Sequence, residues 1–163
     1  MAYGAEAVLG GALARCGPWV GEPHLRLRVE EAAFALRSID DFDWALVRWC
    51  CGVDDGETRR AAWARVMLLG EPAKRHDEAA GLDWPRGRLS ACCATVLEEL
   101  RPRLRQCGLS DAQRLALIAG HERAVPMARG GAWARRWKPR YLAILGEARG
   151  LEERVLAALE LRA

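Results

Sequence analysis

The sequence predicts an all-α protein, a helical bundle, and two observations carry that prediction. Ala, Leu, Arg and Glu are abundant, whereas Ile is scarce and Val only moderately common, a balance that favours helix over strand. Apolar residues recur three or four positions apart through much of the chain, which is the spacing of one helix face. No segment convincingly predicts a strand. At 163 residues the chain is long enough to bury a core.

The N-terminal segment, residues 1–56, is expected to hold three helices, over residues 5–15, 24–37 and 41–51. The first is weak because two adjacent glycines interrupt it, and the second carries its apolar residues on one face. Either Asp40 or Asp41 can cap the third helix, since a carboxylate suits the positive end of the helix dipole. Gly52 is predicted to end it.

The middle segment, residues 57–108, is expected to form a module of three helices, over residues 57–69, 72–80 and 85–101. Gly70 is predicted to end the first of these helices, and residues 81–84 turn the chain between the second and the third. Pro85 suits the first position of a helix, where a missing N–H costs nothing. Pro102 is predicted to kink the last turns before Gly108.

The C-terminal segment, residues 109–163, is expected to be helical and basic. Ser110 and Gln113 have the spacing of a capping box, which predicts a helix to about Ala119. A basic, loop-like stretch follows. Further helix is predicted over residues 133–145, interrupted by Pro139, and over residues 151–161.

The charges are unevenly distributed, although the formal net charge is only +3. The stretch from Arg123 to Arg140 holds six basic residues and no acidic one, whereas the stretch from Asp40 to Glu57 holds six acidic residues against Arg48. Two oppositely charged stretches in one small protein predict two different kinds of partner surface.

The six cysteines and three histidines do not have the spacing of a metal site. The cysteines form no C-x-x-C pair, and the histidines are far apart, so neither a zinc site nor a disulfide scaffold is predicted. Most of the cysteines are expected to be small core residues. The residues in question are Cys16, Cys50, Cys51, Cys92, Cys93, Cys107, His24, His76 and His121.

Enzymatic activity is not expected, nor is a cofactor. The sequence has no Ser/His/Asp set, no phosphate-binding loop and no nucleotide fingerprint. It also has no apolar run near the roughly 18 residues that a membrane span needs. A signal peptide would require a basic residue before its apolar stretch, and this sequence has none before Arg15. We therefore expect a cytoplasmic protein without a membrane partner.

The three helices of residues 57–108 resemble the DNA-binding helix-turn-helix of sigma-factor region 4. The strongest similarity lies in PRGRLSACCATVLEELR, where an arginine and a glycine follow a short turn and lead into a helix with an apolar stripe. The resemblance places the turn at Leu82 to Trp84. Two positions depart from the pattern, because Asp83 stands where a glycine is usual and Glu78 where a buried aliphatic residue is expected.

This resemblance implies a set of DNA-binding residues. The second helix of such a unit enters the major groove, and residues of the first lie near the backbone. Carried onto this chain, the DNA contacts would be made by Lys74, Arg75, Trp84, Arg86, Arg88, Ser90 and Ala91.

Other segments resemble phage late-gene antiterminators of the Q class, including their AlpA-type relatives. LARCGPW is similar to the R-W-G-x-W opening of some members, and WARRWKPRYLAIL is similar to the W-x-R-x-x-K-P-x-Y ending of lambda-type members. The cysteine-rich zinc-binding insertion of lambda-type members is missing from this sequence, so a metal is not implied.

The Q-class resemblance implies a transcription antitermination factor. Such proteins bind double-stranded DNA at a promoter, load onto RNA polymerase by contacting its core and sigma subunits, and suppress termination near the nascent RNA. The basic, aromatic segment would suit contact with polymerase or nucleic acid, since arginines pair with phosphates and aromatic rings stack on bases. Its residues are Arg129, Trp133, Arg135, Arg136, Trp137, Lys138 and Arg140.

Two other functions are compatible with the same sequence. One is a helix-turn-helix repressor or activator, which would bind a palindromic site as a symmetric dimer. The other is a helical adaptor or inhibitor that binds no DNA and has no salt-dependent affinity for it. The tryptophans of the basic segment could equally be core residues with a fringe of solvated arginines.

Overall fold

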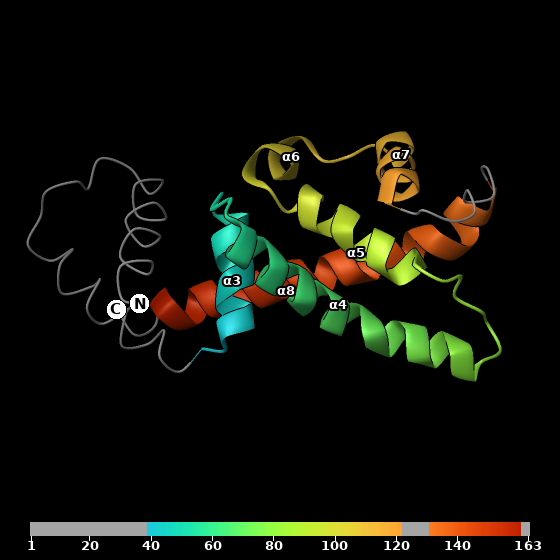
Figure 1. The fold of residues 1–163 in the computed structure, drawn as a ribbon, viewed down its shortest axis with the longest axis horizontal. Helices are drawn as coiled ribbons and strands as arrows, with labels where there is room; N and C mark the ends of the chain where they lie inside the picture. Colours follow the sequence, from blue (N-terminus) through green and yellow to red (C-terminus); the bar gives the residue numbers. More distant parts are fainter. Residues whose placement is uncertain (1–38, 122–130, 161–163) are drawn as a thin grey trace, which may run out of the picture.

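The computed structural model describes residues 39–121 and 131–160, and these residues are mostly helical with no strand. The all-α prediction is therefore confirmed for this part of the chain. In order, the elements are α3 (Asp41–Cys50), α4 (Gly56–Ala79), α5 (Arg88–Glu99), α6 (Pro102–Cys107), α7 (Asp111–His121), the π-helical turn η1 (Trp133–Trp137) and α8 (Lys138–Glu160) (Figure 1). The helices predicted over residues 5–15 and 24–37 lie outside the described residues.

The helices pack around α5 and α8. α8 runs behind α3, α4 and α5 along the length of the molecule, and α5 also contacts α4 and α7 (Figure 1). The hydrophobic core is continuous from Leu46 on α3 to Val155 on α8 and draws on parts of all three predicted segments. Within the described ranges, no helix combines the length and the apolar composition needed to cross a membrane.

α3 begins and ends as the sequence predicts. The Asp40 carboxylate accepts a hydrogen bond from the Phe42 amide at 2.8 Å, so Asp40 is the N-cap. The chain turns away after Cys51 through Gly52, whose φ of 88° lies in the region that glycine tolerates best.

The predicted helix end at Gly70 is wrong, because α4 is one continuous helix of 24 residues. Gly70 is buried where three helices meet. A Cβ built there would lie 2.7 Å from Leu89 Cδ1 of α5 and 3.2 Å from Ile144 Cδ1 of α8. The glycine is thus a packing residue and not a stop signal.

Pro72 also lies within α4 and does not begin a second helix. A proline inside a helix removes the hydrogen bond to the carbonyl four residues earlier, which here belongs to Leu68. Both residues are on the exposed side of α4, where solvent can satisfy that carbonyl. The two predicted helices over residues 57–69 and 72–80 are therefore one.

α5 begins at Arg88 and not at Pro85. Gly87 precedes it with a φ of 82°, and the Arg88 amide donates to the Pro85 carbonyl in a turn. At the other end, α5 stops at Glu99. Pro102 does not kink α5 but occupies the start of the separate helix α6, where a proline is well tolerated.

The capping box at the start of α7 is confirmed. The Ser110 amide donates to Gln113 Oε1 at 2.9 Å, and the Gln113 amide donates to Ser110 Oγ at 3.3 Å. α7 continues to His121, two residues beyond the predicted end.

The two helices predicted after residue 131 are one, since α8 runs unbroken through Gly150 to Glu160. Pro139 does not interrupt it but stands in its first turn, directly after the wider turn η1. The Lys138 amide donates to the Trp133 carbonyl, five residues earlier. Because Pro139 has no N–H for the usual bond to Arg135, the wider turn accommodates it.

A buried polar network ties α5, α7 and α8 together. The Glu99 carboxylate, 1% exposed, accepts hydrogen bonds from Arg114 Nη2 at 2.6 Å, from Arg114 Nε at 3.0 Å and from the Tyr141 hydroxyl at 2.6 Å. Burial acts to raise the pKa of Glu99, but the hydrogen bonds from Arg114 and Tyr141 outweigh it and lower the pKa. Glu99 is therefore a carboxylate at neutral pH.

Candidate nucleic-acid interface

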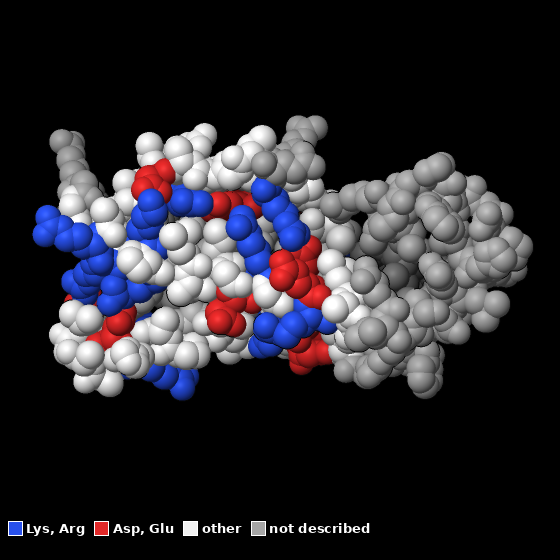
Figure 2. Space-filling model, turned by 180° about the vertical axis from the view of Figure 1, so that it is seen from behind, with Lys and Arg blue, Asp and Glu red and all other residues white. Residues whose placement is uncertain are grey.

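Basic side chains gather at one end of the molecule, where α4 ends and where α5 and α8 begin. We call this surface the basic end. Figure 2 shows the blue side chains concentrated there, whereas blue and red alternate elsewhere on the same face. It is formed by Lys74 and Arg75 of α4, Arg86 of the following connection, Arg135 and Arg136 of η1, and Lys138 and Arg140 of α8, while Arg88 of α5 is buried against Trp137.

The exposed cations of the basic end are weakly neutralised by the protein. Arg86 and Arg135 are exposed and form no ion pair with any described residue. Lys74 pairs with Glu78, and Arg75 pairs with Glu71, each at 3.8 Å along the same helix. The Arg75 side chain is 79% exposed. Pairs of this kind are worth a few tenths of a kcal/mol, so these side chains are available to an outside anion.

The inner layer of the basic end is built on Trp137. The guanidinium carbons of Arg88 and Arg136 each lie 4.7 Å from the centre of its ring, and that of Arg140 lies at 5.9 Å. Trp84 packs edge-on against the same ring, with 5.0 Å between the centroids. Cation–π contacts of this type fix the arginines in place.

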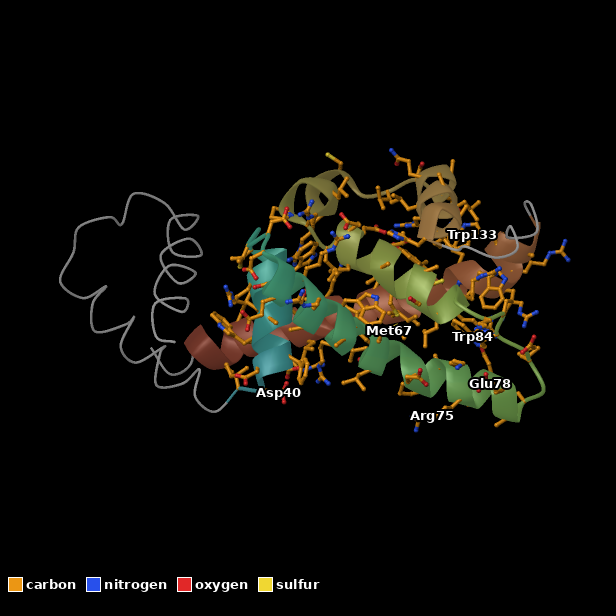
Figure 3. The ribbon with its side chains drawn as sticks, viewed as in Figure 1. Asp40, Met67, Arg75, Glu78, Trp84 and Trp133 are labelled. Atoms are coloured by element: carbon orange, nitrogen blue, oxygen red, sulfur yellow. The ribbon has the colours of Figure 1, made fainter. Side chains whose placement is uncertain are left out.

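Asp77 fixes the connection between α4 and α5 against α8. Its carboxylate accepts a hydrogen bond from Trp84 Nε1 at 2.8 Å and contacts the Arg140 guanidinium through two nitrogens, one of them at 2.9 Å. The hydrogen bonds from Arg140 lower the pKa of Asp77 against the opposing effect of burial, and Trp84 adds to that lowering. Figure 3 shows Trp84 between this connection and α8, with Arg75 on the outer side of α4.

Replacing Asp77 by Asn is expected to lower the free energy of unfolding at pH 7 by about 2–4 kcal/mol, because the partly buried Arg140 guanidinium loses its carboxylate. A carboxyl group with a lowered pKa contributes stability above its unfolded pKa, near 3.9, and loses it as the pH falls. Between about pH 5 and pH 3, the free energy of unfolding of the variant should therefore fall less than that of the wild type. Urea unfolding at each pH measures this difference. Equal losses would contradict the role of Asp77.

The structure separates the DNA-binding residues implied by the helix-turn-helix resemblance into two groups. Lys74, Arg75 and Arg86 reach the surface, and Ser90 is half-buried. Three others are core residues, and their assignment as DNA contacts is corrected: Trp84, Arg88 and Ala91 are 5%, 4% and 1% exposed.

The burial of α5 has a general reason. This helix lies between α4, α7 and α8, so most of its side chains face another helix and no broad face remains for a DNA groove. The connection from α4 to α5 spans residues 80–87, longer than the three or four residues typical of a helix-turn-helix. Glu78 is exposed and pairs with Lys74, so the position expected to be buried lies on the surface.

The residues implied by the Q-class resemblance are also divided. Arg129 lies outside the described residues. Trp133 and Trp137 are buried, so their assignment as contacts to a partner is corrected. Lys138 Nζ lies 2.8 Å from Asp111, and Arg140 binds Asp77, which leaves Arg135 as the most exposed member.

The two sets of predicted contacts form one surface rather than two. Arg136 of η1 donates to the carbonyl of Asp83 in the α4–α5 connection, and Trp137 packs against both Trp84 and Arg88. Residues from both sets therefore lie at the same end of the described structure.

Asp77 and Glu99 were not predicted to be important, although the sequence holds a signal for Asp77. It follows Val66 by eleven residues and Gly70 by seven, which places a carboxylate on the buried face of α4. A charged residue on the buried face of a helix requires a polar partner. The sequence does not reveal that the partners are Trp84 and Arg140.

Three of the five described cysteines are core residues, whereas Cys51 is half-buried and Cys107 is exposed. Cys50, Cys92 and Cys93 are buried, and burial raises the pKa of the Cys50 and Cys93 thiols. Among the described residues, no three His, Cys, Asp or Glu side chains are grouped as a metal site would require. Cys16 and His24 lie outside the described residues.

Comparison with known proteins gives no relative from which a function could be transferred: no protein-family model, curated protein or solved structure matches this chain.

Proposed function

We propose that this protein is a DNA-binding transcription factor of the Q-like antitermination type, which contacts duplex DNA through its basic end while it associates with RNA polymerase. The observation that carries the proposal is the convergence at one end of cations from α4, the α4–α5 connection, η1 and α8. Clustered Lys and Arg side chains are the electrostatic footprint of a nucleic-acid-binding surface.

The structure also bears on the alternative of a helix-turn-helix repressor or activator. That function requires a recognition helix that presents several side chains to base edges. α5 is the helix in the corresponding position, and its Arg88 and Ala91 side chains are buried. To bind DNA in the manner of sigma region 4, α5 would therefore have to leave its contacts with α7 and α8. We therefore favour DNA contact through the surface cations over contact through α5.

The proposal is tested by transcription from a template with a promoter and a downstream terminator, using purified bacterial RNA polymerase holoenzyme. Adding the protein is expected to raise the fraction of transcripts that pass the terminator. The double variant Arg86→Glu/Arg135→Glu should lose this effect together with its affinity for duplex DNA, because it reverses two cations at the basic end. Unchanged readthrough on addition of the wild type would reject antitermination.

Arg60→Glu provides the matched control. Arg60 is an exposed arginine in the second turn of α4, about 22 Å along the helix from Arg75 at 1.5 Å per residue. The Arg60→Glu variant should bind duplex DNA nearly as well as the wild type does. If the wild type binds no DNA at low salt, the DNA-binding proposal fails, whereas a helical adaptor that acts without nucleic acid remains compatible with the result.

A further inference from the structure

The last turns of α4 have most of their surface exposed. Between Glu71 and Ala80, Asp77 is buried and the other residues are half-buried or exposed. Figure 3 shows Arg75 and Glu78 on this end of α4, with Arg75 on the side that faces away from α5 and α8. Whereas most side chains of α5 are covered by other helices, this end of α4 has a free outer face.

Asp77 fixes the orientation of this helix end. Its carboxylate accepts a hydrogen bond from Trp84 Nε1 and binds the Arg140 guanidinium, so Asp77 faces α8. Successive residues of a helix are turned by about 100°, so Arg75 is turned by about 200° from Asp77 and lies nearly opposite to it. The contacts on the inner face therefore hold the outer face in a defined direction.

Four charged side chains share this outer face, at spacings of three and four residues that bring them side by side along the helix. They are Glu71, Lys74, Arg75 and Glu78. The Arg75 side chain is 79% exposed and that of Glu78 is 46% exposed. The two ion pairs within the set are 3.8 Å long and lie at the surface, where such pairs contribute little. All four side chains can therefore turn towards an outside partner.

The mixture of donors and acceptors on this face suits base edges better than phosphates. In the major groove, arginine and lysine donate to O6 and N7 of guanine, and glutamate accepts from N4 of cytosine. Phosphates repel a glutamate that faces them, whereas the middle of the groove offers it amino groups. The outer face thus has the chemistry required to read G·C base pairs.

Exposed cations lie beside this helix end. Arg86 is exposed on the connection that follows α4, and Arg135 is exposed on η1. Arg136 of η1 donates to the Asp83 carbonyl and so joins η1 to that connection. Contacts from such cations to phosphates orient a protein on the duplex and leave sequence reading to other side chains.

We propose that the last turns of α4 enter the major groove of duplex DNA and read G·C base pairs, with Arg75 and Glu78 as the base-contacting residues. Arg86 and Arg135 contact phosphates in this arrangement. The inference rests on the proposed function and names the element by which the basic end recognises its site. The reading helix is then α4 and not α5, the helix that the helix-turn-helix resemblance places in the groove.

The inference is tested by selecting duplexes that bind the full-length protein from a pool of random sequence. The starting and selected pools are sequenced, and fluorescence anisotropy measures the affinity of the protein for each pool. We expect the selected pool to be enriched in a short motif with at least one G·C pair at a fixed position. It should bind at least about tenfold more tightly than the starting pool.

Two variants of exposed residues identify the reading side chains. Arg75→Ala should weaken binding to the selected pool by roughly 5- to 100-fold, and binding to the starting pool by less than about threefold, because a base contact is lost. Glu78→Gln should shift the preferred base at one position from cytosine to adenine, since glutamine pairs with N6 and N7 of adenine. Circular dichroism checks that both variants are folded.

Arg86→Ala and Arg60→Ala are the controls. Arg86→Ala removes a phosphate contact and should weaken binding to both pools by the same factor. Arg60 lies on α4, about 22 Å from Arg75, so Arg60→Ala should change the affinity for neither pool.

Three results would overturn the inference, and they differ in meaning. DNA binding without enrichment of any motif would reject base reading and leave the proposed function intact. A motif whose preference survives both Arg75→Ala and Glu78→Gln would place the reading residues elsewhere in the chain. Failure to bind any DNA at low salt would reject the proposed function as well.

Discussion

Replacing Glu99 by Ala is expected to lower the free energy of unfolding by about 3–5 kcal/mol, since it leaves a partly buried guanidinium and a buried hydroxyl without their carboxylate. Glu99 is the common partner of Arg114 on α7 and Tyr141 on α8, so the change should loosen two helices together. Equilibrium unfolding in urea, followed by circular dichroism, measures the loss.

The neighbouring residue supplies the control. Glu98 pairs with Arg59 at 3.4 Å and with Arg101 at 3.9 Å, near the surface. Glu98→Ala should therefore cost no more than about 1 kcal/mol. Similar losses for the two alanine variants would show that the network around Glu99 contributes no more than a surface ion pair.

A second network variant separates the hydroxyl contact from the ion pair. Tyr141→Phe removes only the 2.6 Å hydrogen bond to Glu99 and should cost about 1–2 kcal/mol. Because the two residues interact directly, the loss in the double variant Glu99→Ala/Tyr141→Phe should be smaller than the sum of the single losses. Additive losses would contradict that coupling.

Replacing Gly70 by Leu is expected to lower the free energy of unfolding by about 3 kcal/mol, because the new side chain has no space. Even a Cβ at this position would lie 2.7 Å from Leu89 Cδ1, 3.2 Å from Ile144 Cδ1 and 3.3 Å from Cys93 Sγ. These atoms are side-chain atoms of two other helices, so a leucine can be accommodated only if the packed side chains of α5 and α8 are displaced. Thermal unfolding should show the loss directly.

Gly146→Leu is the matched control, since Gly146 also lies inside a long helix but a Cβ there meets no atom within 4 Å. Leucine is a better helix former than glycine, so this variant should be as stable as the wild type or slightly more stable. If Gly70→Leu behaved in the same way, the close packing of α4 against α5 and α8 would be contradicted.

The local features of the fold followed from the sequence because they depend on neighbouring residues. Asp40 caps α3, Gly52 ends it, and Ser110 and Gln113 form their capping box as predicted. Each of these contacts joins residues at most three positions apart or reflects the conformational freedom of one glycine. The helical composition likewise predicted an all-α chain.

The errors arose where a residue with a strong local preference meets a tertiary contact. Gly70 and Pro72 predict a helix end, yet α4 continues through both because Gly70 fits against Leu89 and Ile144. Pro85 predicts the start of a helix, yet α5 begins at Arg88, after the left-handed turn at Gly87. At Gly70, packing between helices outweighed the low helix propensity of glycine, which disfavours a helix by about 1 kcal/mol relative to alanine.

By itself, the sequence determined the helical class, the caps and the identity of the basic residues that form the candidate site. Only the tertiary structure decided which of those residues face solvent and that the two predicted contact regions are one surface. The physical reason is that helical periodicity specifies which side chains share a face but not which partner covers that face. Here α8 places Trp137 against Trp84 and Arg88 and binds Asp77 through Arg140, so the aromatic rings lie inside and Arg86 and Arg135 remain exposed.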